Sequence, residues 1–365
     1  MQYSTFAAID IGSYDVILEI FEISKKQGIR SVDKICHRME LGKDTYTLGK
    51  IRPEMEEELC RVLADFVRIM EGYRVDDYRA TASSAISEAS NSLYVLGKIH
   101  QLTGLSVTVL SNSEQRFLSY KALAAMEDNF NKIIEKGTAI LDLDGGSFQI
   151  SLFDKDALVT TQNIRMGSLR IRERLAGIQS ETEHYEEMVE ELIWNEVSSF
   201  KKMYLKDRKI ENIMLIGDVF TDSVYQNIEE KTTKIISREN FNTWYEKIIR
   251  QSPMELAVKL GIPLENASLM YPSAVIYKCL IDMMGAEHIW IPGVHMTRGI
   301  AYEYAEQMKL LKGGHNFEND ILMAAKNIGK RYAVNRPHVQ NLEMTALAMF
   351  DATKKMHGMK AVSYT

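Results

Sequence analysis

The chain has 365 residues, of which 45% are hydrophobic and 26% are charged, and its 44 Lys and Arg residues face 50 Asp and Glu residues for a formal net charge of -6. These values exclude collagen-like and intrinsically disordered proteins, and the length favours two domains over a single core. The acidic balance provides no general attraction to nucleic acid or anionic lipid. We therefore expect no nucleic-acid partner, and we expect any polyanion to be bound locally.

Cysteine usage and hydropathy indicate the compartment. Cys36, Cys60 and Cys279 are far apart and form no C-x-x-C pair, which argues against a zinc site or a disulfide framework. No run of apolar residues approaches the length of a membrane span, and the first residues lack the pattern of a secretory signal. We expect a cytoplasmic protein that makes no contact with a membrane.

The first third of the chain predicts the element order βββαβαβα. In chain order we expect strands over 5–10, 16–23 and 30–41, a helix over 51–70, a strand over 77–82, a helix over 91–102, a strand over 106–110 and a helix over 113–129. In the helix over 51–70, Pro53 lies near the start and Gly72 follows the end, as is typical of helix termini.

The next third repeats the beginning. TAILDLDGGS at 138–147 has the pattern of AAIDIGS at 7–13, and apolar strand patterns follow both segments. Downstream we expect strands over 148–155, 157–164, 213–217 and 288–292 and helices over 181–202 and from 298 onwards. Several helices are expected between the strands at 213–217 and 288–292. The repeat is too long for a solenoid, so it predicts two similar α/β domains with a cleft between them.

Three regions follow from this repeat. We expect a first domain over 1–128, a second over 129–312 and a helical appendage over 313–365. The appendage has two stretches with helical spacing of apolar residues, joined by a segment that contains Asn335 and Pro337, which we interpret as a loop.

Each repeat places an acidic residue at the end of an apolar strand. Asp10 precedes Gly12 and Ser13, and Asp142 precedes the turn formed by Gly145, Gly146 and Ser147. Backbone amides of such turns bind phosphate oxygens, and a carboxylate at each strand end can hold a Mg²⁺ ion that bridges them. The alternative interpretation is two ordinary hairpin turns, but their recurrence in equivalent places favours a phosphate clamp.

Four motifs together resemble one known family. AAIDIGS, ILDLDGGS, LSNSEQRFLSYKAL at 110–123 and MGSLRIRERL at 166–175 are similar to motifs of the exopolyphosphatase and guanosine pentaphosphate phosphohydrolase (Ppx/GppA) family. ASSAISEASN at 82–91 and the stretch 285–304 add to this resemblance, which runs from about residue 7 to residue 304. The family belongs to the acetate and sugar kinase, Hsc70 and actin superfamily.

The resemblance implies a fold and an activity. We expect two ribonuclease H-like (actin-like ATPase) domains with an interdomain cleft, followed by the start of a helical domain. Members hydrolyse the terminal phosphoanhydride of inorganic polyphosphate or guanosine pentaphosphate with Mg²⁺. The expected partner is one of these two substrates, and a homodimer is a further expectation.

The resemblance also assigns roles to residues. Asp10 and Asp142 would hold magnesium and the attacked phosphate, Glu114 would activate the attacking water, and Arg170 would contact phosphate oxygens. For Glu114 the alternative is a helix-start acid, with Ser111 or Ser113 as the cap. Three neighbouring arginines are interpreted as solvated charges: Arg165, Arg172 and Arg174.

Several residues depart from the family pattern. Gln115 replaces a second acid after Glu114, and the loop 217–221 differs from G-x-G-G-T. The other departures are Tyr14, Asp15, Ser87, Asp144, Phe148 and Gln149, the last of which replaces a metal-associated Glu. Added negative charge and lost ligands weaken the binding of phosphate or Mg²⁺.

Three hypotheses follow. The first is a Mg²⁺-dependent phosphoanhydride hydrolase. The second is a catalytically weakened member that binds nucleotide or polyphosphate as a sensor or regulator. The third, a sugar or acetate kinase, is weaker because the sequence has no evident adenosine loop of the Gly-Gly type and no sugar pocket.

Overall fold

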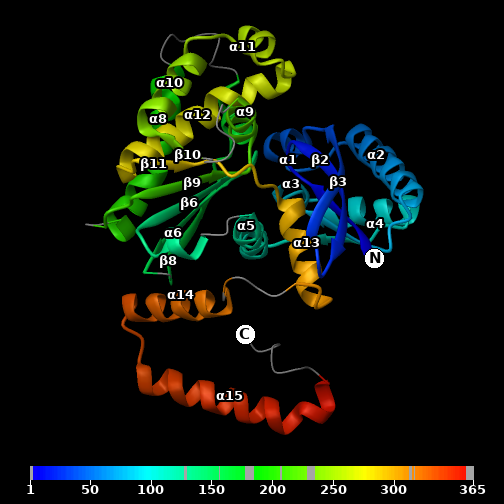
Figure 1. The fold of residues 1–365 in the computed structure, drawn as a ribbon, viewed down its shortest axis with the longest axis vertical. Coiled ribbons are helices and arrows are strands. Elements are labelled where there is room, and N and C mark those ends of the chain that lie inside the picture. Colours follow the sequence, from blue (N-terminus) through cyan, green and yellow to red (C-terminus); the bar gives the residue numbers. More distant parts are fainter. Residues whose placement is uncertain are drawn as a thin grey trace.

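The computed structural model describes residues 3–126, 130–155, 157–176, 185–205, 208–227, 235–311, 315 and 317–358. Two α/β lobes lie side by side, and two further helices extend away from them (Figure 1). Each lobe is built on one mixed sheet, so the two similar α/β units expected from the sequence repeat are present.

The first sheet has the order β3-β2-β1-β4-β5. Its strands are β1 (Ser4–Ile11), β2 (Asp15–Ser24), β3 (Gly28–Arg38), β4 (Asp77–Ala82) and β5 (Val107–Val109). β1 to β3 form an antiparallel meander, whereas β4 and β5 run parallel to β1. The central strand β1 is apolar because both its faces are covered, and it ends at the candidate site.

The second sheet has the order β10-β11-β9-β6-β7-β8. Its strands are β6 (Thr138–Leu143), β7 (Phe148–Asp154), β8 (Ala157–Ile164), β9 (Asn212–Ile216), β10 (Ile235–Ser237) and β11 (His288–Trp290). β6 to β8 form the same antiparallel meander, and β9 and β11 are parallel to β6. The strand order of the first lobe therefore recurs, with β10 added at the edge.

Helices cover both faces of each sheet. The first lobe carries α1 (Leu41–Leu48), α2 (Pro53–Gly72), α3 (Ser84–Ser87) and α4 (Ser92–Thr103). The second lobe carries α6 (Phe130–Ile134), α7 (Ser168–Leu175), α8 (Tyr185–Phe200), the π-helix η1 (Lys201–Leu205), α9 (Val219–Asn227), α10 (Arg238–Ile249), α11 (Pro253–Leu260) and α12 (Leu264–Met284). α2 and α4 pack on one face of the first sheet, and α8, α10 and α12 pack on the second.

Two helices cross between the lobes. α5 (Asn112–Met126) packs on the second sheet, where Tyr120 and Leu123 meet Ile140 and Phe153. α13 (Met296–Gln307) packs under the first sheet, where Phe6 stacks on Tyr304. The two helices also pack against each other, so each ties the lobes together beneath the cleft. The expected domain limits at 128 and 312 lie outside the described residues and stay a prediction.

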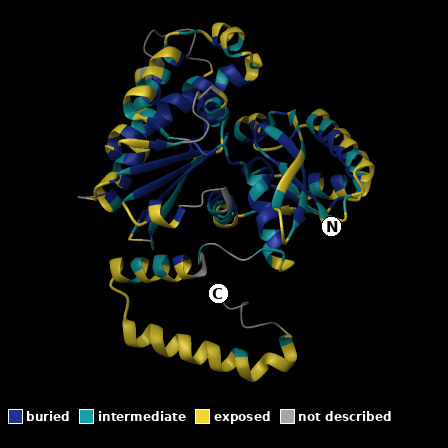
Figure 2. Ribbon diagram, viewed as in Figure 1, coloured by how far each residue is buried: buried dark blue, intermediate teal, exposed yellow. Residues whose placement is uncertain are grey.

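The appendage consists of α14 (Phe317–Arg331) and α15 (Arg336–His357). α14 lies against the edge strand β8, whereas α15 has no buried residue (Figure 2). Asn335 caps α15 and Pro337 lies in its first turn, so the expected loop over these residues is part of the helix start. No helix of the described residues is long and apolar enough to cross a membrane.

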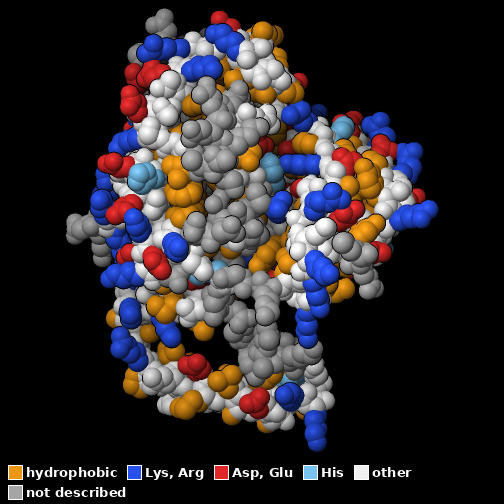
Figure 3. All heavy atoms as spheres, in the orientation of Figure 1, with side chains coloured by type: hydrophobic (Ala, Val, Ile, Leu, Met, Phe, Trp, Pro, Cys, Tyr) orange, Lys and Arg blue, Asp and Glu red, His pale blue; other side chains and the backbone are white. Residues whose placement is uncertain are grey.

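Most elements lie within a few residues of their expected places. The short elements α1, α3, α6, α7 and β10 were not expected, because each has too few residues for a clear periodicity. The expected helices over 113–129 and 181–202 run partly outside the described residues. Lys and Arg side chains are interspersed with Asp and Glu on the face in Figure 3, as the balanced composition suggests.

Candidate active site in the cleft between the lobes

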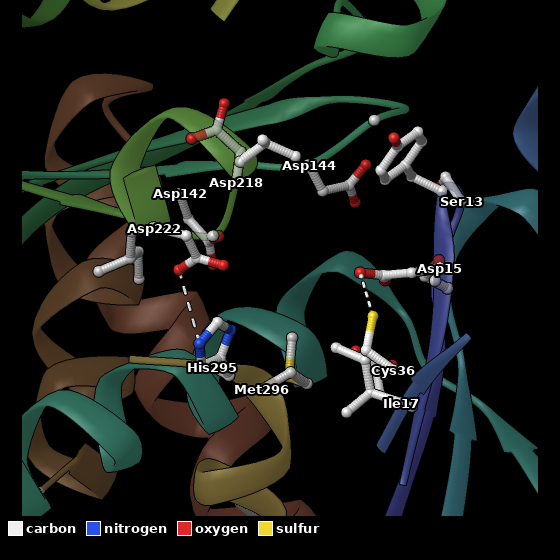
Figure 4. Close-up of a pocket in the computed structure, with 18 of the residues that line it drawn as sticks. Ser13, Asp15, Ile17, Cys36, Asp142, Asp144, Asp218, Asp222, His295 and Met296 are labelled. Carbon is white, nitrogen blue, oxygen red and sulfur yellow. Dashed lines mark hydrogen bonds and ion pairs between the residues drawn. The ribbon is translucent and has the colours of Figure 1, made fainter. Parts of the chain in front are cut away.

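A cavity of about 270 Å³ lies between the two lobes, at the ends of β1, β6 and β9. Carboxylates from both lobes face it (Figure 4). The charged and titratable side chains that line it are Asp10, Asp15, Lys34, Cys36, Arg38, Asp142, Asp144, Asp218, Asp222 and His295, together with the Tyr14 phenol. Acidic groups outnumber basic ones, so an anionic ligand needs accompanying cations.

The first loop joins β1 to β2 by a tight turn. The Gly12 amide donates to the Asp15 carbonyl at 2.9 Å, and this turn leaves Asp10 facing the cavity. The Ser13 hydroxyl lies 2.6 Å from the Tyr46 hydroxyl and 3.3 Å from that of Ser84. Gly12 and Ser13 both line the cavity, as expected, but the amide of Gly12 and the hydroxyl of Ser13 already have partners within the first lobe.

The second loop joins β6 to β7 and is closed by its own aspartate. The Asp142 carboxylate faces the cavity and accepts a hydrogen bond of 2.6 Å from the Ser119 hydroxyl on α5. Asp144 Oδ1 accepts from the amides of Gly146 and, at 3.4 Å, Ser147. Of this loop's predicted phosphate-binding residues, Gly145 lines the cavity, and the other two donate their amides to Asp144.

The acidic side chains destabilise one another's charged forms. Burial raises the pKa of Asp10 to about 7, with Asp15, Asp144 and Asp142 as further causes. Burial likewise raises the pKa of Asp142 to about 6, and Asp144 adds to this shift while Ser119 opposes it. A divalent cation between the loops would offset this repulsion.

These carboxylates fit a magnesium ion that is completed by substrate. In the part of the chain that the structure describes, no three His, Cys, Asp or Glu side chains form a ready-made metal cluster. Mg²⁺ typically uses one or two carboxylates, retained waters and substrate phosphates rather than an all-protein cage. The two enclosed carboxylates of Asp10 and Asp142, with raised pKa values and one shared cavity, suit that mode.

Glu114 does not line this cavity. It is exposed in the first turn of α5, and its Oε2 accepts from the Ser111 amide at 2.8 Å and from the Ser111 hydroxyl at 2.7 Å. These bonds lower its pKa, and with the bond from the Glu114 amide to the Ser111 hydroxyl they form a capping box. The next residue, Gln115, faces the cavity instead, and its amide has no useful basicity.

Arg170 joins the lobes instead of lining the cavity. Its guanidinium stacks 3.8 Å from the Tyr46 ring centroid, its Nε donates to the Gly146 carbonyl at 2.8 Å, and it pairs with Glu88 at 3.0 Å. The structure thus gives Arg170 a partner for its charge other than phosphate.

Two further contacts connect the two lobes on the same side of the cleft. Arg172 forms a bidentate pair with Glu40, with both bonds at 2.8 Å, so the expectation of a solvated charge for Arg172 is wrong. The Tyr14 hydroxyl donates to Asn266 Oδ1 at 2.6 Å, and its ring packs on Leu169. Because both contacts cross between lobes, they hold the two loops in register.

The cavity residues that were not identified from the sequence include Lys34, Asp218, Asp222 and His295. Asp218 follows β9, is enclosed next to the Tyr277 hydroxyl at 3.2 Å, and has its pKa raised to about 7, chiefly by burial. Asp222 lies in the first turn of α9, and His295 caps the start of α13. Asp218 stands in the loop that departs from G-x-G-G-T, which was the one available signal.

The comparisons with known proteins agree with this architecture. The model of the Ppx/GppA phosphatase family matches residues 19–308. The chain belongs to this family. A crystal structure of an exopolyphosphatase from Cytophaga hutchinsonii is similar with a TM-score of 0.74 at 17% identity, over 83% of this chain and 98% of that chain. The family member from Aquifex aeolicus has a TM-score of 0.67 at 17% identity, over 84% of this chain and 99% of that one.

Curated relatives match only in part. A bifunctional 3-dehydroquinate synthase/phosphatase of Fusobacterium nucleatum is 21% identical over 310 residues, which are 78% of this chain and 44% of that protein. Exopolyphosphatase 1 of Mycobacterium leprae is 25% identical over 144 residues, 39% of this chain and 41% of that protein. The chain thus spans less than half the length of these relatives. The structural likeness establishes the two-domain actin-like fold of this Ppx/GppA member.

Proposed function

We propose that this protein hydrolyses a terminal phosphoanhydride, in inorganic polyphosphate or in a nucleotide polyphosphate such as guanosine pentaphosphate, with Mg²⁺. The observation that carries the proposal is the meeting of the Asp10 and Asp142 loops in one cavity between the lobes. Family membership and relatives described as exopolyphosphatases support the same chemistry.

The chain's own residues provide the setting for this reaction. Asp10 and Asp142 would hold magnesium, which when bound neutralises phosphate charge and aligns the terminal phosphate. Lys34 and Arg38 at the cavity wall would meet the rest of the anion. The cross-lobe pair of Arg172 and Glu40 keeps the two loops at a fixed separation.

Phosphate release tests the proposal. Malachite-green assays with polyphosphate, guanosine pentaphosphate and ATP, with and without Mg²⁺, should detect release from at least one of the first two substrates and loss of release with EDTA. Asp142→Asn should abolish it. Folded protein that releases no phosphate from any of them would refute the proposal.

A binding or regulatory role is the second candidate, and two amides favour it. Gln115 faces the cavity where a carboxylate would be useful, and Gln149, opposite Asp142 across β6 and β7, is buried. Its Oε1 has no hydrogen-bond partner among the described residues. Saturable, Mg²⁺-dependent binding of guanosine pentaphosphate without turnover would support this role over hydrolysis.

A further inference from the structure

The cleft contains a histidine and an aspartate that belong to neither repeat loop. His295 Nε2 lies 3.5 Å from Asp222 Oδ1 (Figure 4). Both residues line the cavity with Asp10 and Asp142. His295 stands at the N-cap of α13, the helix that crosses beneath the first sheet, and Asp222 comes from α9 of the second lobe. The imidazole is therefore held at the junction of the two lobes.

Hydrolysis needs a group that accepts a proton from the attacking water. The helix-start carboxylate of Glu114 is bonded to Ser111 away from the cavity, and Gln115 cannot accept a proton at neutral pH. Asp144 is bonded to loop amides, and Asp10 and Asp142 are assigned to the metal. Two further cavity carboxylates already accept hydrogen bonds: Asp15 from the Cys36 thiol, and Asp218 from the Thr221 amide and the Tyr277 hydroxyl. His295 provides the one imidazole among the described residues that line the cavity, and it is paired with a separate carboxylate.

The geometry points to His295 as the proton acceptor for the attacking water, with Asp222 as its positioning residue; this inference rests on the proposed hydrolase function. Asp222 Oδ1 lies 3.5 Å from Nε2, so the tautomer with its proton on Nε2 would leave the lone pair of Nδ1 for a water. Among the described residues, Nδ1 has no hydrogen-bond partner. This arrangement of base and orienting carboxylate is the general pattern of an activated water or nucleophile.

The step balances in atoms and charge. The water oxygen forms a bond to the terminal phosphorus while one of its protons passes to His295 Nδ1. The bond from that phosphorus to the bridging oxygen breaks, and its electron pair stays on the shortened chain. The imidazolium, stabilised by Asp222, then returns its proton to solvent. The products are inorganic phosphate and a chain one phosphate shorter.

Charged groups from several elements line the same cavity as the imidazole. Asp222 comes from α9, Asp15 from β2, Lys34 from β3 and Asp142 from β6. The carboxylates among them stabilise an imidazolium, and Lys34 opposes it. Asp222 is the carboxylate that pairs with His295, so its replacement tests whether the orientation of the imidazole matters for turnover.

Steady-state kinetics over a pH series tests the inference. His295→Gln should lower kcat by about 10² to 10⁴, the usual range for a general base, with a smaller change in KM. Imidazole added to His295→Ala should restore part of the activity. Asp222→Asn should lower kcat with little change in KM, as expected for a residue that positions the base. His288→Gln, an exposed histidine on the same segment, is the matched control.

The outcomes separate the two proposals. Wild-type kcat and pH profile in folded His295→Gln, with Asp142→Asn inactive, would overturn the role of His295 and leave the hydrolase intact. Loss of kcat in Glu114→Gln but not in His295→Gln would also overturn it. Wild-type protein that releases no phosphate would refute the hydrolase and this inference together. Circular dichroism and thermal melts establish that each variant is folded.

Discussion

Asp144 occupies the second-loop amides that would otherwise bind a phosphate oxygen. Its Oδ1 accepts from the Gly146 amide and, at the longer distance of 3.4 Å, from the Ser147 amide. A phosphate at these amides must displace the carboxylate, and it also meets the carboxylate's negative charge. We therefore predict that Asp144→Asn tightens the binding of phosphate chains, because asparagine keeps a side-chain acceptor but loses the charge.

The hydrogen bonds of Asp144 determine how much the affinity for a phosphate chain should rise in Asp144→Asn. A charge-assisted hydrogen bond contributes about 1.5 to 3 kcal/mol and a neutral one about 0.5 to 1.5 kcal/mol, so each full bond changes by about 1 to 1.5 kcal/mol. The hydrogen bond from the Ser147 amide is long, so it contributes less to this free-energy difference. Relief of charge repulsion adds to the difference, which gives about 1.5 to 3 kcal/mol, or about 10- to 100-fold in affinity.

Isothermal titration with a short polyphosphate at fixed Mg²⁺ measures this change. The matched control is Asp76→Asn, which alters a carboxylate that accepts from the Thr5 amide at 2.8 Å at the far end of β1. The control should leave affinity unchanged. Weaker binding in Asp144→Asn, together with a higher Mg²⁺ requirement, would show that Asp144 acts as a metal ligand and would refute the reasoning.

Three further predictions concern the two contacts between the lobes and the buried carboxyl groups. Arg172→Gln should lower the free energy of unfolding by about 1 to 3 kcal/mol, since it leaves Glu40 without its bidentate partner. A double-mutant cycle with Glu40→Gln isolates the interaction between the two side chains. Losses of unfolding free energy that simply add in the double mutant would contradict this prediction. Tyr14→Phe should lower urea stability by about 1 to 3 kcal/mol, because Asn266 loses a buried donor; unchanged stability would argue against the contact. The raised pKa values of Asp10 and Asp218, each about 7, mean that the folded state binds more protons than the unfolded chain between about pH 4 and 7. Stability without Mg²⁺ should therefore fall as pH rises from 5 to 8, and Mg²⁺ should raise the melting temperature most at pH 8; a flat profile would contradict this.

The duplicated fold could be predicted because its signal is local. β1 and β6 are short apolar runs that end in an acid and a turn, and each is followed by two more strands. Such patterns depend on burial along one segment, which the sequence displays directly. The crossing of α5 and α13 could not be predicted in this way, because their amphipathic faces do not say which sheet they cover.

The residues of the candidate site could be predicted only in part from the sequence. The two loop aspartates share the cavity, but Ser111-x-x-Glu114 is also a capping-box pattern, and the structure realises that alternative. Whether Asp144 turns towards its own amides or towards a ligand depends on a turn a few residues long. His295 and Asp222 lie far apart in sequence, so only tertiary structure brings them together.

The negative charge of the cavity couples the binding of Mg²⁺ to the binding of phosphate. The two loops bring Asp10, Asp142 and Asp144 into one enclosed space, where burial raises the pKa values of Asp10 and Asp142 and the negative charge of Asp144 adds to both shifts. Under the proposed function, a phosphate chain alone would add more negative charge and a magnesium ion alone would lack enough protein ligands, so each would favour the binding of the other. By linkage, the factor by which Mg²⁺ raises phosphate affinity equals the factor by which phosphate raises Mg²⁺ affinity. A hydrolase and a sensor share this coupling, and they differ in whether His295 then removes a proton from water.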